Sequence, residues 1–387
     1  MKLSTIMFSV SAPSIRTKSP SLTSASFGSL CCSSYPSLQT KSRNFIPLKN
    51  VALPWNSIST GKRRYLCSVS ASKSENGFTG SSFQGDESFF RSVLAGMETV
   101  YLNRNPTAKA VLELVQSADG EPICYDHFAF RTFGVNGHGI DSMASLFLDY
   151  GYTQKGELRF PAKKLRALWF SPPSIPHSNT GSGVNGPLPR IFISELLVDQ
   201  ISPQAQEIIK KYVEVSASGY KHAALASTLG FLTWNKPLYS EFEQLARESE
   251  YAAWTLVNGY ALNHVTISTH RLKSQLRSIN CLDQFIEDNG FKLNSEGGIL
   301  KAVSPDGLLL QSSTVADSIT FKFSDGVTES VPCSYIEFAE RLVLPQYKNL
   351  PEQEQVREFH RRDGFEVGNA DKIFESTSKE QLTRRAA

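Results

Sequence analysis

The same order of predicted elements occurs twice in this chain, and this duplication limits the possible fold more than any other feature. In each copy, a strand is followed by a helix and then by three more strands. The two helices end on similar sequences, Asp-Tyr-Gly-Tyr at 149–152 and Asp-Asn-Gly-Phe at 288–291. The first copy is predicted at 127–133 (strand), 142–150 (helix), 152–160, 165–171 and 190–198 (strands), and the second at 262–268 (strand), 272–289 (helix), 291–294, 308–314 and 334–341 (strands).

The predicted fold class is therefore α+β, with two βαβββ modules forming one curved sheet around a shared cleft. A helical insert separates the modules and is expected to pack on the sheet, and further helices precede the first module. A hairpin is predicted within the second copy, at 319–323 and the Asp-Gly turn that follows. The expected boundaries are 87–377 for one catalytic domain, about 120–200 for module one, about 201–258 for the insert, about 259–345 for module two, 346–377 for a tail and 378–387 for a disordered end.

The beginning of the chain has the composition of a plastid transit peptide. The first acidic residue is Glu75, and 19 serines and ten Lys or Arg residues come before it. We expect a transit peptide at 1–67, a flexible linker at 68–86, and a mature protein in the plastid stroma, the chloroplast or amyloplast. The presequence has too few arginines to be typical of mitochondrial import.

Removal of that segment would leave 31 basic and 37 acidic residues, so the mature protein would carry a negative net charge. The positive net charge of the full chain is therefore due to the predicted transit peptide. No basic patch remains to predict nucleic acid or an anionic membrane as a partner. The chain has no apolar run near 18 residues, so no membrane span is predicted. The sequence does not identify any protein partners. Cys124, Cys281 and Cys333 are isolated, which excludes a C-x-x-C zinc motif.

The first strand of module one carries a candidate site. His127 and Arg131 lie four residues apart in an aromatic segment, and a strand places both side chains on one face. Their α-carbons would be about 13 Å apart, which leaves roughly 6–8 Å for a ligand between a metal at His127 and the guanidinium of Arg131. A dicarboxylate of five or six carbons has that length, and arginine binds carboxylates through charge-assisted hydrogen bonds.

The duplication supplies further candidate ligands. His264 opens the first strand of module two, as His127 does in module one, and Glu337 lies between apolar neighbours on the last strand. A buried carboxylate has to be paired or ligated. Two histidines and one carboxylate form the facial triad of non-haem iron(II). A closed four-ligand site is the alternative, with Glu195, the presumed counterpart of Glu337 in module one, as its fourth member.

These residues resemble the 2-oxoadipate dioxygenase/decarboxylase (hydroxyglutarate synthase) family, in its plant plastid branch. Members of the family have a vicinal-oxygen-chelate-like fold, in agreement with the duplicated order of elements. The resemblance covers about residues 89–377 and rests on His127-Phe-Ala-Phe-Arg131, Asn263-His264, Ile336-Glu337-Phe338-Ala339-Glu340-Arg341 and Asp363-Gly364-Phe365.

The resemblance implies an iron(II) enzyme that converts 2-oxoadipate and O2 to 2-hydroxyglutarate and CO2, in lysine breakdown. It implies that His127, His264 and Glu337 bind Fe(2+) and are catalytic, and it favours this triad over the four-ligand site. It further implies that Arg131 binds the distal carboxylate of the substrate and that the tail around Val367 lines the substrate end.

Two other functions fit parts of the sequence. Another vicinal-oxygen-chelate enzyme, a glyoxalase-type isomerase or a ring-cleaving dioxygenase, would share the fold, and bound zinc or nickel with Glu195 as a ligand would indicate the isomerase. A plastid regulatory or scaffold protein would keep the fold without the chemistry. The presence of all three ligands and of Arg131 argues against the scaffold.

Overall fold

The computed structural model describes residues 81–383, except 121, 175–180, 297, 300–301 and 352. The predicted transit peptide at 1–67 lies outside these residues, as does most of the predicted linker. Helix α1 (Ser81–Arg104) begins inside that linker, which corrects the predicted boundary. None of the helices in the described part of the chain combines the length and the apolar character that a membrane crossing requires.

The predicted duplication is confirmed by the order of strands in the main sheet, β2-β3-β4-β1-β5-β10-β7-β6. The order is symmetric about the β1–β5 pair, so each strand of one module has a counterpart in the other. Module one consists of β1 (Tyr125–Phe133), α3 (Ile140–Asp149), β2 (Thr153–Phe160), β3 (Leu165–Ser171) and β4 (Arg190–Leu196), and module two of β5 (Leu262–Ser268), α8 (Ile279–Asp288), β6 (Ala302–Val303), β7 (Leu309–Ser313) and β10 (Tyr335–Arg341).

Three further groups of elements surround this sheet. The predicted hairpin is present as a separate two-stranded sheet, and the insert is helical, as expected. These elements are α2 (Pro106–Asp119) after α1, the hairpin β8 (Ser318–Lys322) and β9 (Thr328–Pro332), the insert helices α4 (Pro203–Val215), α5 (Ala223–Leu229), α6 (Tyr239–Glu248) and α7 (Glu250–Asn258), and the C-terminal helices α9 (Val367–Phe374) and α10 (Lys379–Thr383).

Three local predictions are corrected. The strand expected at 291–294 is reduced to one bridge between Leu293 and Thr314, although the Asn294 backbone N–H still donates to the Ser313 carbonyl. The edge strand of module two is β6. Helix α8 begins only at Ile279, after two 3-10 turns. Helix α10 forms inside the end that was expected to be disordered.

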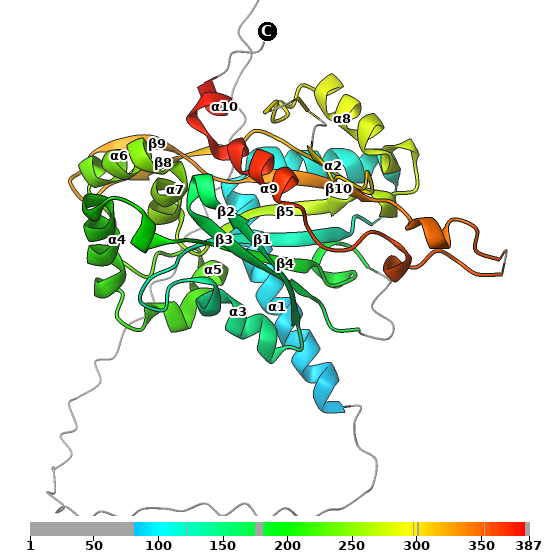
Figure 1. Cartoon of the computed structure of the whole chain (residues 1–387), viewed down its shortest axis with the longest axis horizontal. Helices are drawn as coiled ribbons and strands as arrows, with labels where there is room; N and C mark the ends of the chain where they lie inside the picture. The colour runs from blue at the N-terminus through cyan, green and yellow to red at the C-terminus, as the bar shows by residue number, and fades with distance from the viewer. Residues whose placement is uncertain are drawn as a thin grey trace, which may run out of the picture. The chain divides into compact units, whose positions relative to one another are not determined.

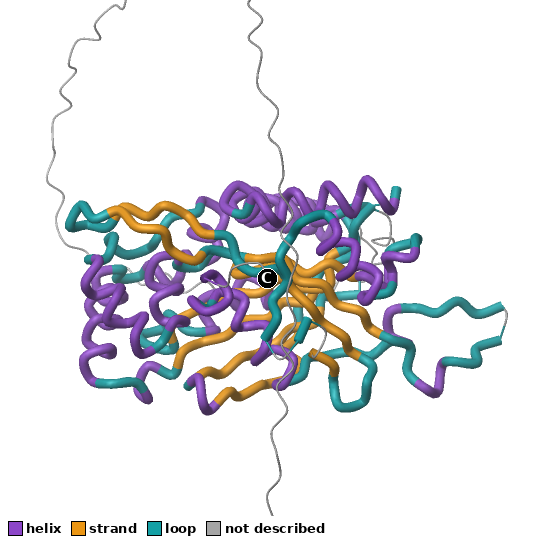
Figure 2. The backbone as a smooth tube through the Cα atoms, turned by 90° about the horizontal axis from the view of Figure 1, so that it is seen from above, coloured by secondary structure: helices purple, strands orange, loops and turns teal. Residues whose placement is uncertain are grey.

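The sheet is curled, and the C-terminal helix α9 spans its opening. Helix α9 contacts β2 at one edge of the sheet and both β6 and β7 at the other edge. Figure 1 shows α9 in front of the sheet and α1 behind it, where α1 contacts β5 and α2 contacts β10. Figure 2 shows the strands fanning out, as in a strongly twisted sheet. The concave face is therefore enclosed by the last helices of the chain.

Strand β1 is buried along its whole length, because both of its faces are covered. Phe128 and Phe130 belong to the main apolar core, and Phe130 packs against Phe147 of α3. Two register shifts interrupt the pairing of β1 with β5, one between Tyr125 and Phe128. Such bulges bend a strand and redirect its side chains. They occur in the segment that carries the candidate site.

One buried acid lies outside that site. Asp283, on the inner face of α8, accepts a hydrogen bond from the Ser312 hydroxyl at 2.5 Å, while its second oxygen has no partner. Burial raises the pKa of this carboxyl from 3.8 to about 7. The folded state therefore binds a proton between about pH 4 and pH 7 that the unfolded state has lost. Stability falls as the pH rises through this range.

Substitution Asp283→Asn should remove this pH dependence, because an amide accepts from Ser312 without a charge. We expect the free energy of unfolding of the variant to exceed that of the wild type at pH 8 by up to about 4 kcal/mol, since each unit of pKa shift corresponds to about 1.4 kcal/mol. Near pH 4 the two free energies should be similar. Urea unfolding at several pH values measures this difference. The exposed Asp288→Asn, on the same helix, is the control, and an equal response of both variants would contradict the assignment.

Candidate functional site

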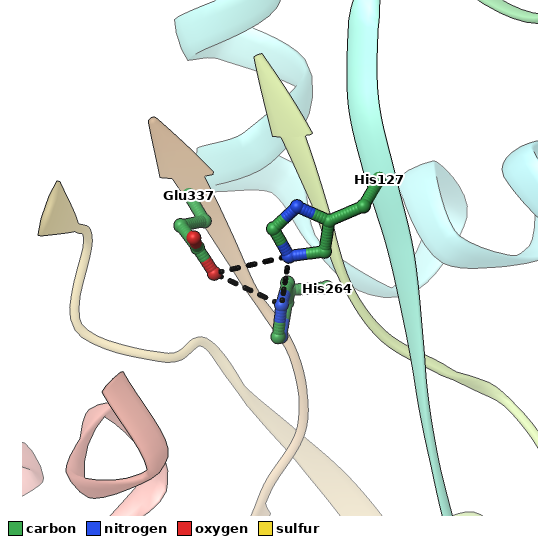
Figure 3. Close-up of side chains that lie close together, drawn as sticks. All are labelled: His127, His264 and Glu337. Atoms are coloured by element: carbon green, nitrogen blue, oxygen red, sulfur yellow. Dashed lines mark hydrogen bonds and ion pairs between the residues drawn. The ribbon is translucent and has the colours of Figure 1, made fainter. Parts of the chain in front are cut away.

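The seam between the two modules brings His127 and His264 together. Strand β1 runs antiparallel to β5, with Ala129 opposite His264. The Nε2 atoms of the two histidines are 3.3 Å apart, and their rings meet edge to face. Both side chains are almost fully buried, at 2% and 4% exposed. The two equivalent histidines of the sequence therefore face one point in space (Figure 3).

Glu337 completes the cluster from the neighbouring strand. Strand β10 runs parallel to β5 and places Glu337 opposite Thr266. The Glu337 Oε2 atom lies 3.0 Å from His264 Nε2 and 3.6 Å from His127 Nε2. The three ligand atoms lie within 4.8 Å of one another. The structure thus brings together all three residues that the sequence singled out as ligands.

The electrostatics of the cluster suit a divalent cation. Burial raises the pKa of Glu337, but the two imidazoles outweigh this effect and hold the pKa at about 2, so the residue is a carboxylate. The same carboxylate raises the pKa of His127 against the effect of burial, whereas burial dominates at His264 and lowers its pKa. Two nitrogens and one anionic oxygen converging in a buried site form a donor set that fits iron(II).

Each histidine is oriented by the residue that precedes it. Asp126 Oδ1 lies 2.9 Å from His127 Nδ1, and Asn263 Oδ1 lies 3.0 Å from His264 Nδ1. An oxygen at Nδ1 keeps the proton there and leaves Nε2 free as a ligand. On Glu337, the oxygen that does not face the histidines accepts from Gln311 Nε2 at 2.6 Å. The three clustered side chains are therefore held in place by hydrogen bonds on their outer sides.

A buried ion pair supports Asp126 in turn. Arg341, at the end of β10, donates to both oxygens of Asp126, at 2.6 and 2.9 Å. Burial raises the pKa of Asp126, but Arg341 and Arg190 together lower it well below its usual range. Arg341 also donates to the Gly364 carbonyl, and the adjacent Phe365 ring packs edge-on against His127 at 4.8 Å. The C-terminal segment is thus joined to the cluster.

Arg131 lies deeper in the same concave face, with only 2% of its surface exposed. Its hydrogen-bond partners in the described part of the chain are neutral, namely the Thr377 hydroxyl at 3.1 Å and the Phe374 carbonyl at 3.4 Å. The rings of Tyr251 and Trp254, from insert helix α7, flank the guanidinium at 5.1 Å.

The Arg131 guanidinium has no ion-pair partner in the described part of the chain. Arg131 forms no ion pair with any carboxylate of the described residues, and its Nε has no hydrogen-bond partner. Burial lowers the pKa of Arg131 from its usual value, yet an arginine stays protonated in proteins. The positive charge is near enough to the cluster to help lower the pKa of His264. A buried cation of this kind calls for an anionic ligand.

The C-terminal tail contacts the site through several residues around Val367. Val367 is the first residue of α9 and is 42% exposed. The contacts with the site come from Phe365 on His127, from Phe374 and Thr377 on Arg131, and from Asn369, which donates to Gln311. The structure therefore gives the tail a larger part than the sequence predicted, while Val367 itself stays a prediction.

Glu195 does not join the cluster. One of its oxygens accepts from the backbone N–H of Ile140 at the start of α3, and the other pairs with Arg166. The sheet register also corrects its presumed equivalence to Glu337. His264 pairs with Tyr335, two residues before Glu337, and His127 pairs with Arg190, two residues before Phe192. The counterpart of Glu337 is Phe192, which cannot bind a metal.

Several residues of the site were missed by the sequence reasoning. Asp126 and Asn263 could have been found, because each directly precedes a ligand histidine and carries a side-chain oxygen. Tyr335 could have been found by its spacing of two from Glu337, which puts both on one face of a strand. Gln311 and the α7 rings carry no such local signal. They lie at the site only because the tertiary fold brings distant parts of the chain together.

The chain matches a family model and curated proteins over most of its length. Residues 93–355 match the model described as 2-oxoadipate dioxygenase/decarboxylase. The chain is 70% identical over 333 residues to the Arabidopsis thaliana protein named 2-oxoadipate dioxygenase/decarboxylase, chloroplastic, covering 84% of this chain and 89% of that protein. It is 69% identical over 328 residues to the chloroplastic/amyloplastic protein of that name from Oryza sativa subsp. japonica, covering 85% and 89%.

A solved structure gives the same result for the fold. The crystal structure of hydroxyglutarate synthase in complex with 2-oxoadipate from Oryza sativa superposes with a TM-score of 0.77 at 70% sequence identity. The match covers 81% of this chain and all of that one.

The metal ligands can be tested with a matched pair of glutamates. Glu337→Gln should lower the bound metal at least tenfold, because a neutral amide is a much poorer ligand than a carboxylate. Glu195→Gln should bind metal like the wild type, because Glu195 caps a helix elsewhere. Metal content after reconstitution with iron(II) under nitrogen measures both. Metal loss in both variants would support the four-ligand site instead.

The orienting role of Asn263 is a second test. Asn263→Ala removes the acceptor at His264 Nδ1 and leaves no buried charge unpaired. A change at Asp126, by contrast, would leave Arg341 without its partner. We expect metal affinity to fall about 10- to 100-fold, measured by competition with a chelator. Asn105→Ala is the control, since that buried asparagine bonds to the backbone of Tyr101 and Ser334 and to neither histidine. It should lower stability but not metal affinity, and equal losses in both variants would contradict the orienting role.

Proposed function

Because the chain belongs to the 2-oxoadipate dioxygenase/decarboxylase family, we propose that His127, His264 and Glu337 bind iron(II) while Arg131 binds the distal carboxylate of the substrate. The protein is an oxidoreductase, a 2-oxoadipate dioxygenase (decarboxylating), and its location is the plastid. The reaction we assign consumes 2-oxoadipate and O2 and releases 2-hydroxyglutarate and CO2. The observation that carries the site assignment is the buried, uncompensated Arg131 beside the buried triad.

The positions of the charges favour a substrate with a carboxylate at each end. The triad offers two neutral nitrogens and one carboxylate, so a divalent cation there would keep a net positive charge that attracts an acid group. Arg131 supplies a second positive charge at the other end of the same concave face. An acid with one carboxylate would leave one of these charges unpaired, and an unpaired buried charge is costly. The site is thus suited to dicarboxylates.

The residues around the cluster control water and protons. Iron(II), when bound, would supply the redox chemistry with oxygen and a Lewis-acid centre for the 2-oxo acid group. Asp126 and Asn263 keep the Nδ1 protons of the histidines in place, so that neither ring turns or changes tautomer. The rings of Phe365, Phe192 and Trp169 pack on one another beside His127. These rings exclude water from this side of the cluster.

The register of the sheet favours this function over a glyoxalase-type isomerase. Phe192 occupies the place in module one that Glu337 occupies in module two. A fourth protein ligand from the equivalent strand position is therefore absent among the described residues. Three ligands leave open coordination positions on one side of a metal ion, as an oxygenase requires.

The substrate role of Arg131 is tested by Arg131→Ala. The variant should retain bound iron(II) but lose at least about 100-fold in kcat/KM for 2-oxoadipate, because the distal carboxylate then lacks its charged partner. Oxygen uptake, CO2 release and 2-hydroxyglutarate formation measure turnover. Arg166→Ala, which removes the arginine paired with Glu195, should behave like the wild type.

Two results would overturn the proposal. If the iron-loaded wild type failed to convert 2-oxoadipate, the assigned reaction would be wrong for this chain. If Arg131→Ala kept full kcat/KM for 2-oxoadipate, the distal carboxylate would have to bind elsewhere. A scaffold protein would show the first of these results with normal folding and normal metal content.

A further inference from the structure

Two buried hydrogen-bond donors in the concave face have no partner in the described part of the chain. They are Arg131 Nε and the hydroxyl of Tyr335, whose residues are 2% and 1% exposed. A buried polar group without a partner costs about 1–3 kcal/mol. The cost is offset when a ligand supplies the acceptor. A pair of unpartnered donors beside a metal site therefore indicates where the polar end of the substrate binds.

Tyr335 is held in a fixed position next to the cluster. It lies on β10 opposite His264, and the two rings stack at 4.7 Å with an angle of 27°. Its backbone carbonyl accepts from the Tyr101 hydroxyl. Tyr335 and Glu337 are two residues apart on one strand, so their side chains leave the same face. The orientation of the Tyr335 ring is thus determined by its neighbours, and its hydroxyl has no hydrogen-bond partner among the described residues.

The Tyr335 hydroxyl and the Arg131 guanidinium are both buried, and both leave a donor without a partner among the described residues. The guanidinium of Arg131 lowers the pKa of the Tyr335 phenol against the larger effect of burial, which identifies the two groups as electrostatic neighbours. The ring of Tyr335 therefore reaches from a metal ligand, His264, toward the guanidinium.

The other contacts of Arg131 explain why a second donor is useful there. Its Nη1 donates to Thr377 and its Nη2 donates to the Phe374 carbonyl. These contacts fix the guanidinium and engage part of its donor set, while the Nε–H stays free. A carboxylate has two oxygens with about four acceptor positions. The free Nε–H edge of Arg131 and the Tyr335 hydroxyl together offer donors to both oxygens.

We propose that the Tyr335 hydroxyl donates a hydrogen bond to the distal carboxylate of the substrate, beside Arg131, and so determines the preference for 2-oxo acids with a second carboxylate. This inference rests on the proposed function, because it requires a substrate carboxylate at Arg131. Tyr335 is then a specificity-determining residue, in addition to packing on His264. A tyrosine that served only to pack would need its ring but not its hydroxyl.

The test distinguishes the role of the Tyr335 hydroxyl from that of its ring. It also distinguishes contacts with the distal carboxylate of the substrate from contacts with its 2-oxo acid group. Tyr335→Phe keeps the ring that stacks on His264 and removes only the donor. Two ligands are compared, 2-oxoadipate and 2-oxohexanoate, which share the 2-oxo acid group and differ in the distal carboxylate. Their Kd values are measured by calorimetry with the full-length, iron(II)-loaded protein under nitrogen, and metal content is measured in the same samples.

We expect Tyr335→Phe to bind 2-oxoadipate about 10- to 100-fold more weakly, the range for one hydrogen bond to a charged group. Binding of 2-oxohexanoate and metal content should stay within about twofold of the wild type. In turnover, kcat/KM for 2-oxoadipate should fall by a similar factor. Tyr260→Phe is the matched control, because that buried hydroxyl bonds to His138 outside the site, and it should change none of these values.

Three outcomes would overturn the proposal. An unchanged Kd for 2-oxoadipate would show that the hydroxyl does not contact the substrate. Equal losses for both acids would place the hydroxyl at the 2-oxo end, and a loss of metal would make its role structural. All three presuppose a wild type that converts 2-oxoadipate. A wild type without this activity would instead refute the proposed function, so the two failures are distinguishable.

Discussion

The pairing of β1 with β5 is the interaction on which the rest of the site depends. It joins the two modules into one sheet and brings His127 and His264 to a distance of 3.3 Å between their Nε2 atoms. Each of these strands has a parallel partner on its outer side, β4 for β1 and β10 for β5. Glu337 reaches the two histidines only because β10 is in register with β5. A shift of one residue in either pairing would point a ligand away from the cluster.

Burial of so many charged groups is tolerated because nearly all of them are paired. Asp126 is matched by Arg341 and Arg190, and Glu337 by two imidazoles and an amide donor. Removing one partner of such a pair leaves a costly buried charge. Arg131 differs, since its hydrogen-bond partners are neutral and aromatic rings flank it. Among the described residues it forms no ion pair, and an anionic substrate would supply the missing partner.

The two modules and the three clustered residues could be predicted from the sequence, because the repeated order of strands and helices and their apolar patterns can be recognised in a single sequence. Prediction from the sequence failed for features that depend on strand register or on contacts between residues far apart in the chain. Glu195 was matched to Glu337 from its flanking apolar residues, although the sheet makes Phe192 the counterpart. The two-residue strand β6 is too short to leave a periodic pattern. Contacts between Arg131 and Phe374 join residues 243 positions apart, which no local rule can anticipate.

The last helices of the chain connect substrate recognition with closure of the site. Helix α9 spans the opening of the curled sheet, and the residues around it contact His127, Gln311 and Arg131. Lys163, beyond the end of β2, pairs with Asp371 and Glu375 and fixes this helix to module one. One segment of the chain therefore supplies both the ring that packs on His127 and the groups that bond to Arg131. If the proposed site is right, a change that loosens this segment should both admit water to the cluster and misplace Arg131, so exclusion of water and substrate selectivity would change together.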